Sequence, residues 1–189
     1  NVKREMSKVK SYETKYRRDD IMIEKFYLNI RGKRNLALIV WLSRYLIGFA
    51  FIPSGMKKVL GLRFTSLGVE TPIGFFFEAL YQSGGYWYFL GIGQVLAALL
   101  MMTQRLATLG TLIFTFIIAN IWVITVSLHF GGTWLITTFL FFGCICLLLW
   151  DYNKLQFLFY RDNFVVDKRY QGLPEPSSIW VINGCILFV

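Results

Sequence analysis

Arg44, Gln94 and His129 are polar or ionisable residues in or beside long apolar stretches, so we considered them first as candidates for chemistry. Arg44 lies eight positions into the apolar run Leu36–Pro53, about 12 Å along a helix that rises 1.5 Å per residue. A charge at that depth in a membrane costs several kcal/mol unless it is paired or reaches the surface. We therefore expect Arg44 to have a partner, either as part of a ligand site or as a pin that fixes the register of neighbouring helices.

Gln94 is the polar residue that the sequence places closest to Arg44. It lies nine positions before Thr103, at the end of a second apolar run, and two antiparallel helices would bring the two side chains to one depth. A carboxamide oxygen accepts a hydrogen bond from a guanidinium but does not neutralise it. A carboxylate should also be near, and Asp151 and Glu78 are the candidates.

His129 is the single histidine, and it follows the third apolar run, beside Gly131. A membrane haem usually needs a second strong axial ligand, and Met56 is available for this role but has no supporting motif. Two interpretations of His129 remain: a hydrogen-bonded residue at the rim, or a group that handles protons or a quinone carbonyl. In the second case Arg44, Gln94 and His129 are the candidate cofactor-binding residues and quinone is the candidate cofactor.

The cysteines do not form a redox motif. Cys144 and Cys146 are two positions apart in a helical run, which separates them by about 200° around the helix axis, so they cannot pair with each other. The sequence has no C-x-x-C pair, which a quinone-coupled disulfide enzyme would need. We expect these two residues and Cys185 to be apolar fillers. No ligand cluster supports a metal site.

Four apolar runs must position these residues. Each is about long enough to cross a ~30 Å hydrocarbon core as a helix, and none alternates like a strand. With 56% hydrophobic residues, the chain has too little polar surface for a soluble domain of 189 residues. The sequence therefore predicts an all-α polytopic membrane protein, a four-transmembrane-helix bundle, with spans at Leu36–Pro53, Tyr86–Thr103, Leu106–Ser127 and Trp134–Trp150.

A short helix is expected between the first and second spans. Thr71 is a suitable N-cap, Pro72 suits the first helical position, and Gly84 ends the apolar stretch that follows. About ten residues cannot span a membrane, so we interpret the segment as an interfacial or re-entrant helix over the outer mouth of the bundle. Glu78 lies either on its exposed face or toward the bundle.

The distribution of charge predicts the orientation. The net charge is +9, and eleven of the twenty Lys and Arg residues lie between Lys3 and Arg34. If both termini share one side, sixteen Lys and Arg residues lie there and three on the other side. Cytoplasmic segments carry such an excess, so we expect an N-in, C-in protein of the bacterial cytoplasmic (inner) membrane. The basic segment also carries acidic residues, so nucleic-acid binding is not expected.

The chain is expected to have three parts. Residues 1–35 form a basic cytoplasmic segment, whose apolar positions between Tyr12 and Ile30 suggest a helix face that binds a partner. Residues 36–154 form the membrane domain, and residues 155–189 an interfacial or cytoplasmic extension. Ile179–Val189 is too short to span. Because the chain does not begin with methionine, one interpretation is that this run starts a further hydrophobic segment of a longer protein.

Several motifs, in a fixed order between Ser43 and Leu155, resemble the DoxX-like family of four-helix bacterial membrane proteins. The motifs are Arg44-Tyr-Leu-Ile-Gly48, Phe51, Gly55-Met-Lys-Lys58, Gly91-Ile-Gly-Gln94, Leu99, Arg105-Leu-Ala107 and Gly110. The resemblance implies the four-span fold more firmly than a reaction. The family includes a subunit type associated with thiosulfate oxidation coupled to quinone, members linked to oxidative-stress complexes and many members without an assigned activity.

One position departs from that family pattern. Relatives often carry glutamate where this chain has Gln94, and the departure removes a carboxylate from the expected surroundings of Arg44. It therefore argues against proton or redox chemistry there.

Three functions remain. The favoured one is an accessory or structural subunit of a larger membrane complex, without catalysis of its own and with membrane lipids and other membrane protein subunits as partners. The alternative is a quinone-linked membrane oxidoreductase component of the thiosulfate:quinone type. The second alternative is a small-molecule or lipid carrier.

Overall fold

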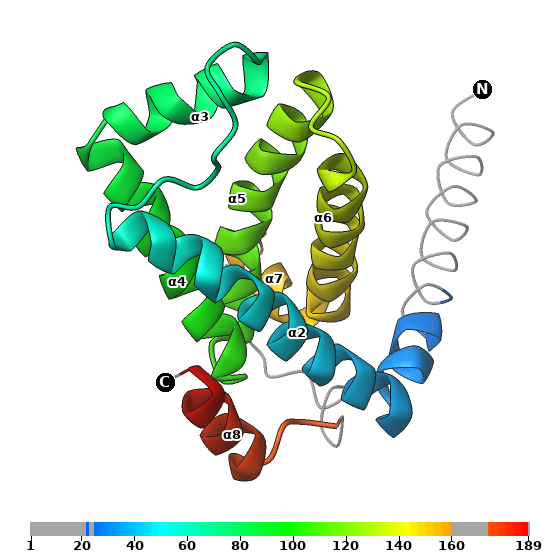
Figure 1. The fold of residues 1–189 in the computed structure, drawn as a ribbon. Helices are drawn as coiled ribbons and strands as arrows, with labels where there is room; N and C mark the ends of the chain where they lie inside the picture. Colours follow the sequence, from blue (N-terminus) through cyan, green and yellow to red (C-terminus); the bar gives the residue numbers. More distant parts are fainter. Residues whose placement is uncertain (1–21, 23–24, 160–173, 189) are drawn as a thin grey trace, which may run out of the picture. The chain divides into compact units, whose positions relative to one another are not determined.

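A computed structural model describes residues 22, 25–159 and 174–188. Within these ranges the regular structure is entirely helical, and residues 25–31 form a first short helix. The labelled helices are shown in Figure 1: α2 (Arg34–Val59), α3 (Pro72–Gln82), α4 (Gly85–Met102), α5 (Ala107–Ser127), α6 (Thr133–Trp150), α7 (Tyr152–Phe159) and α8 (Ser178–Phe188).

The chain divides into two compact units. One consists of Asn1–Ile39 and Val165–Glu175, and the other of Val40–Phe164 and Pro176–Val189. In the first, the short helix ends at Gly32, whose N–H donates to the Leu28 carbonyl. The second contains all the residues of the candidate sites described below.

Four helices, α2, α4, α5 and α6, are long and apolar enough to cross a membrane, with mean hydropathies between 1.4 and 2.2 over their best windows. The prediction of a four-helix membrane bundle is therefore confirmed. The observed helices match the predicted runs closely except at the end of α2, which continues through Pro53 to Val59. Membrane helices tolerate an internal proline, and the turns beyond Pro53 are held by contacts with α4.

The core of the bundle lies between α2, α4, α5 and α6. Phe114 of α5 is fully buried and packs edge to face on Phe51 of α2, with ring centroids 4.6 Å apart. Cys144 lies in the same core, whereas Cys146 and Cys185 are exposed, and all three are free thiols. Large apolar side chains such as Phe116 and Phe139 face outward, as expected where lipid replaces water as the solvent.

Glycines set the contact between α2 and α4. A Cβ atom on Gly91 would lie 2.8 Å from the backbone nitrogen of Val59 and 2.9 Å from the Gly55 carbonyl oxygen. A Cβ atom on Gly48 would lie 2.8 Å from the Cγ of Met102. Only small residues permit such an approach between membrane helices. Gly48, Gly55 and Gly91, which belong to the motifs that resemble the DoxX-like family, thus lie in the contact between α2 and α4.

Replacing Gly91 with alanine should destabilise the protein, because the new Cβ would press on backbone atoms of α2 rather than on movable side chains. Such overpacking costs about 1–3 kcal/mol, which lowers the Tm by roughly 2–4 °C per kcal/mol in a chain of this size. The matched control is Gly143→Ala in α6, where a Cβ meets nothing within 4 Å. Thermal unfolding in detergent measures both, and equal Tm values would contradict the assigned crossing.

The short helix between the first two spans is present as predicted. The Thr71 hydroxyl accepts a hydrogen bond from the Gly74 N–H at 3.1 Å, and Pro72 is the first helical residue. Phe77 of α3 packs near Phe64, which follows α2, and near Phe130 in the α5–α6 turn. Helix α3 therefore contacts segments at the end of the bundle where α2 ends and α4 begins.

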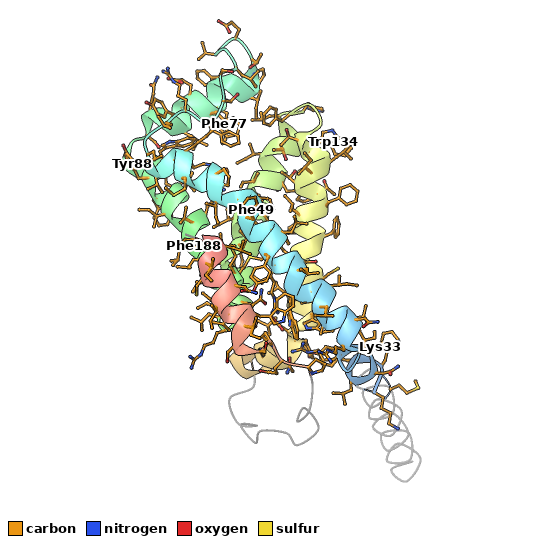
Figure 2. The ribbon with its side chains drawn as sticks, turned by 60° about the horizontal axis from the view of Figure 1, so that its bottom comes forward. Lys33, Phe49, Phe77, Tyr88, Trp134 and Phe188 are labelled. Carbon is orange, nitrogen blue, oxygen red and sulfur yellow. The ribbon has the colours of Figure 1, made fainter. Side chains whose placement is uncertain are left out.

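Helix α8 packs against α2 and α4 (Figure 2). The Trp180 ring stacks on Tyr45, with centroids 5.7 Å apart, and meets Trp41 edge to face. The Tyr45 hydroxyl donates to the Trp180 carbonyl. A Cβ on Gly184 would overlap the Met102 carbonyl, so the two helix backbones touch directly.

Candidate functional site

The first buried polar group, which we call the Arg44 cluster, consists of Arg44, Gln104, Thr108 and Asp151. The guanidinium of Arg44 donates to Asp151 Oδ2 at 2.6 Å and to Gln104 Oε1 at 3.1 Å. The Thr108 hydroxyl donates to the same carboxylate oxygen at 2.8 Å. The side chains of the ion pair are 3% and 2% exposed.

The Arg44 cluster joins elements that are far apart in the sequence. Arg44 lies on α2, Gln104 in the α4–α5 turn, Thr108 in the first turn of α5, and Asp151 at the end of α6. Gln104 also donates to the Trp41 carbonyl at 3.3 Å. Each charge is thus neutralised and hydrogen-bonded by protein groups, the condition under which a buried ion pair is tolerated.

The expected carboxylate partner of Arg44 was Asp151 or Glu78, and Asp151 is the one observed. The pairing of Arg44 with Gln94 was wrong, because Gln104 takes that place. The physical reason is helix register. The glycine contacts set Gly48 beside Met102 and Gly55 beside Gly91, so Gln94 lies level with the end of α2 rather than with Arg44.

The second buried polar group, the Lys58 cluster, consists of Ser54, Lys58, Phe64, Trp87 and Gln94. The Lys58 ammonium donates to the Ser54 carbonyl at 3.0 Å, to the Ser54 hydroxyl at 3.1 Å and to Gln94 Oε1 at 3.0 Å. It also lies 4.7 Å from the Phe64 ring centroid and 5.3 Å from that of Trp87. Lys58 is 6% exposed and Gln94 is 2% exposed.

Within the described ranges, no carboxylate forms an ion pair with Lys58. Lys58 lies in the last turn of α2, where the helix dipole stabilises a cation by about 0.3–1 kcal/mol. The Phe64 and Trp87 rings each stabilise the ammonium by about 0.5–2 kcal/mol. These terms offset part of the several kcal/mol that burying an ion costs, but they supply no negative charge. This site was not predicted from the sequence, because Lys58 was counted there only as a charge outside the spans. The available signal was the spacing of four residues between Ser54 and Lys58, which places both side chains on one face of a helix.

Glu78 lies outside both clusters. It accepts two hydrogen bonds from Arg63, at 2.9 and 3.0 Å, and one from Gln82. These bonds, led by those from Arg63, lower the pKa of Glu78 below the usual 4.5, and the same pair raises the pKa of Arg63.

The carboxyl signal of Glu78 in a carbon-13 NMR titration should therefore have its midpoint below 4.5, the ordinary value for glutamate. Because the folded pKa is depressed, the contribution of this pair to stability is present above the unfolded pKa and is lost as the pH falls through the folded pKa. In Arg63→Gln the midpoint should rise. If Arg63→Gln leaves the midpoint unchanged, a group other than Arg63 stabilises the ionised carboxylate of Glu78.

His129 is exposed in the turn after α5, with a left-handed backbone φ of 50°. Among the described residues its ring forms no hydrogen bond, and its backbone N–H donates to the Val126 carbonyl at 3.3 Å. Arg44, Gln94 and His129 therefore have different neighbours, and the structure does not bring them together. In the ranges described, no three His, Cys, Asp or Glu residues gather as a metal site.

A shallow apolar groove of about 440 Å³ opens beside α8. Its walls come from α2 and α8, and it is lined by Leu42, Tyr45, Trp180, Asn183, Ile186 and Leu187.

Comparison with known proteins finds a relative of uncharacterized function. No protein-family model matches the sequence. The chain is 32% identical over 125 residues to "Uncharacterized protein YwoB" of Bacillus subtilis (strain 168), which covers 63% of this chain and 80% of YwoB. The chain belongs to the YwoB family. No solved structure matches.

YwoB is described as uncharacterized, so membership of the YwoB family assigns no activity to this chain. In this YwoB-family chain the Arg44 cluster contains one charge of each sign, and the Lys58 cluster contains a cation alone. The first is suited to fastening helices together. The second is suited to receiving an anion.

Proposed function

We propose that this YwoB-family protein is a DoxX-like protein of the bacterial cytoplasmic membrane, N-in and C-in, that serves as an accessory or structural subunit of a larger membrane complex. The observation that carries the proposal is the closure of the Arg44 cluster. Its guanidinium is bonded to Asp151 and Gln104, so the most costly polar residue of the spans is engaged by other segments of the bundle.

The outer surface of the bundle supports a role in assembly. Each long helix presents large apolar side chains outward, and these surfaces suit either lipid or the helices of a partner. The basic segment of residues 1–35, in which we placed a partner-binding face, lies mostly outside the described residues.

Photo-cross-linking in cells distinguishes these two neighbours. A cross-linking amino acid is placed at one outward position on each long helix: Leu46, Phe89, Phe116 and Phe139, which are 71%, 68%, 69% and 77% exposed. A complex subunit should give a discrete protein adduct from one or two positions and none from the others. Purification in a gentle detergent, followed by mass spectrometry, should recover the same partner. A lone monomer with no adduct at any position would refute the proposal.

The oxidoreductase alternative is less well supported by the geometry. A quinone site made of Arg44, Gln94 and His129 requires these three side chains to lie together. In the structure Arg44 bonds to Gln104 and Gln94 bonds to Lys58, so the three side chains lie in different surroundings. Its test is quinone reduction by the purified protein with a sulfur donor. Activity that is lost in Arg44→Ala while the protein stays folded would favour this alternative over the subunit role.

The carrier alternative is favoured by one observation, the apolar groove beside α8, whose volume falls in the range of small-molecule sites. Brominated acyl chains should quench the fluorescence of Trp180 if lipid occupies this groove. The quenching should fall in Trp180→Phe, and reconstituted vesicles should show transport of the lipid. Equal quenching of both proteins would count against the carrier.

A further inference from the structure

Lys58 is a buried cation whose described hydrogen-bond partners are all neutral. They are the backbone and side-chain oxygens of Ser54 and the side-chain oxygen of Gln94. The single acidic side chain of α3, Glu78, is engaged by Arg63. Arg44 differs from Lys58 in this respect, because Arg44 has Asp151 as its counter-charge. Among the described residues, no carboxylate forms an ion pair with Lys58.

Gln94 adds a second donor at the same place. The ammonium of Lys58 can only donate, so the Gln94 oxygen must face it and the amide NH₂ points elsewhere. Gln94 is 2% exposed, and its NH₂ group donates to no group among the described residues. An amide NH₂ group beside an ammonium is a second donor at the same place, and the acceptor that suits both groups best is an anion with several oxygens.

The position of the cluster indicates which oxyanion is available. Lys58 lies in the last turn of α2, next to the beginning of α4. Half-exposed aromatic residues lie at this same end, including Tyr86, Tyr88 and Trp134; Figure 2 shows Tyr88 and Trp134 there. Tyr and Trp concentrate at the level of lipid headgroups, where the abundant oxyanion is phosphate.

We propose that Lys58 and Gln94 form a binding site for a phosphate group, supplied by the headgroup of a phospholipid or by free phosphate. The anion balances the buried charge of Lys58 and accepts from the NH₂ group of Gln94. The proposal goes beyond the subunit role and does not depend on it.

The test is thermal unfolding of the purified full-length chain in a neutral detergent. Dioctanoyl phosphatidylglycerol should raise the Tm by several degrees, whereas dioctanoylglycerol, which has the same acyl chains without phosphate, should not. A second arm compares sodium phosphate with sodium chloride at equal ionic strength. A shift with the phospholipid alone identifies the headgroup as the source, and a shift in both arms means that the phosphate group is sufficient.

Three variants locate the site. Lys58→Met should weaken phospholipid binding at least tenfold. Gln94→Glu supplies an internal carboxylate, so this variant should fold well without ligand and lose the response. Lys57→Met is the matched control, because Lys57 is the exposed neighbour, and it should keep the response. No shift of the wild type in either arm, or an equal shift in Gln94→Glu, would overturn the proposal.

Discussion

Asp151→Asn should destabilise the protein by about 3–5 kcal/mol, because it leaves the guanidinium of Arg44 buried without its counter-charge. The change keeps the size of the side chain, so packing is preserved and the effect reports the charge. Thr108 would also lose its anionic acceptor. Thermal or denaturant unfolding in detergent measures the loss.

The double variant Arg44→Met with Asp151→Leu provides the control. Removing both members of a buried ion pair is often neutral or stabilising when apolar groups of similar volume replace them. We therefore expect the double variant to be more stable than Asp151→Asn alone. If the double variant is the less stable of the two, the loss in Asp151→Asn does not come from an uncompensated charge on Arg44, and the stated cause of that loss is wrong.

Phe114→Ala should cost about 3–5 kcal/mol, the usual range for a phenylalanine removed from a packed core. Phe114 is fully buried and contacts Phe51 across the α2–α5 contact. The control on the same helix is Phe116→Ala, since Phe116 is 69% exposed and should change the unfolding free energy little. Similar losses in both variants would mean that α5 is rotated relative to its described position.

Much of the fold could be predicted because the membrane imposes strong rules on composition. Four apolar runs gave four helices, and the Thr71-Pro72 pair gave the start of α3. The end of α2 could not be predicted, because proline often ends helices in soluble proteins. Here α2 continues past Pro53 to Val59, and Gly55 in that part of the helix lies against α4.

The candidate site was predicted only in part. The need to neutralise Arg44 predicted a carboxylate partner, with Asp151 and Glu78 as the candidates, and Asp151 is the one observed. Its carboxamide partner was misassigned, because counting residues from a membrane boundary ignores how helices slide along one another. Lys58 was missed because burial at a helix end depends on Phe64 and Trp87, which come from other segments.

The glycine contacts between α2 and α4 fix the register of these two helices. Gly48 lies against Met102 and against the Ala98 carbonyl one turn earlier on α4, and Gly55 lies against Gly91. The interval from Gly48 to Gly55 on α2 and the interval from Gly91 to Ala98 on α4 are therefore both seven residues, which is close to two full turns. Deleting one residue between the two contact positions of either helix would rotate one of them by about 100° around the helix axis, away from the neighbouring helix. The crossing of α2 and α4 described here therefore requires the same seven-residue spacing on both helices.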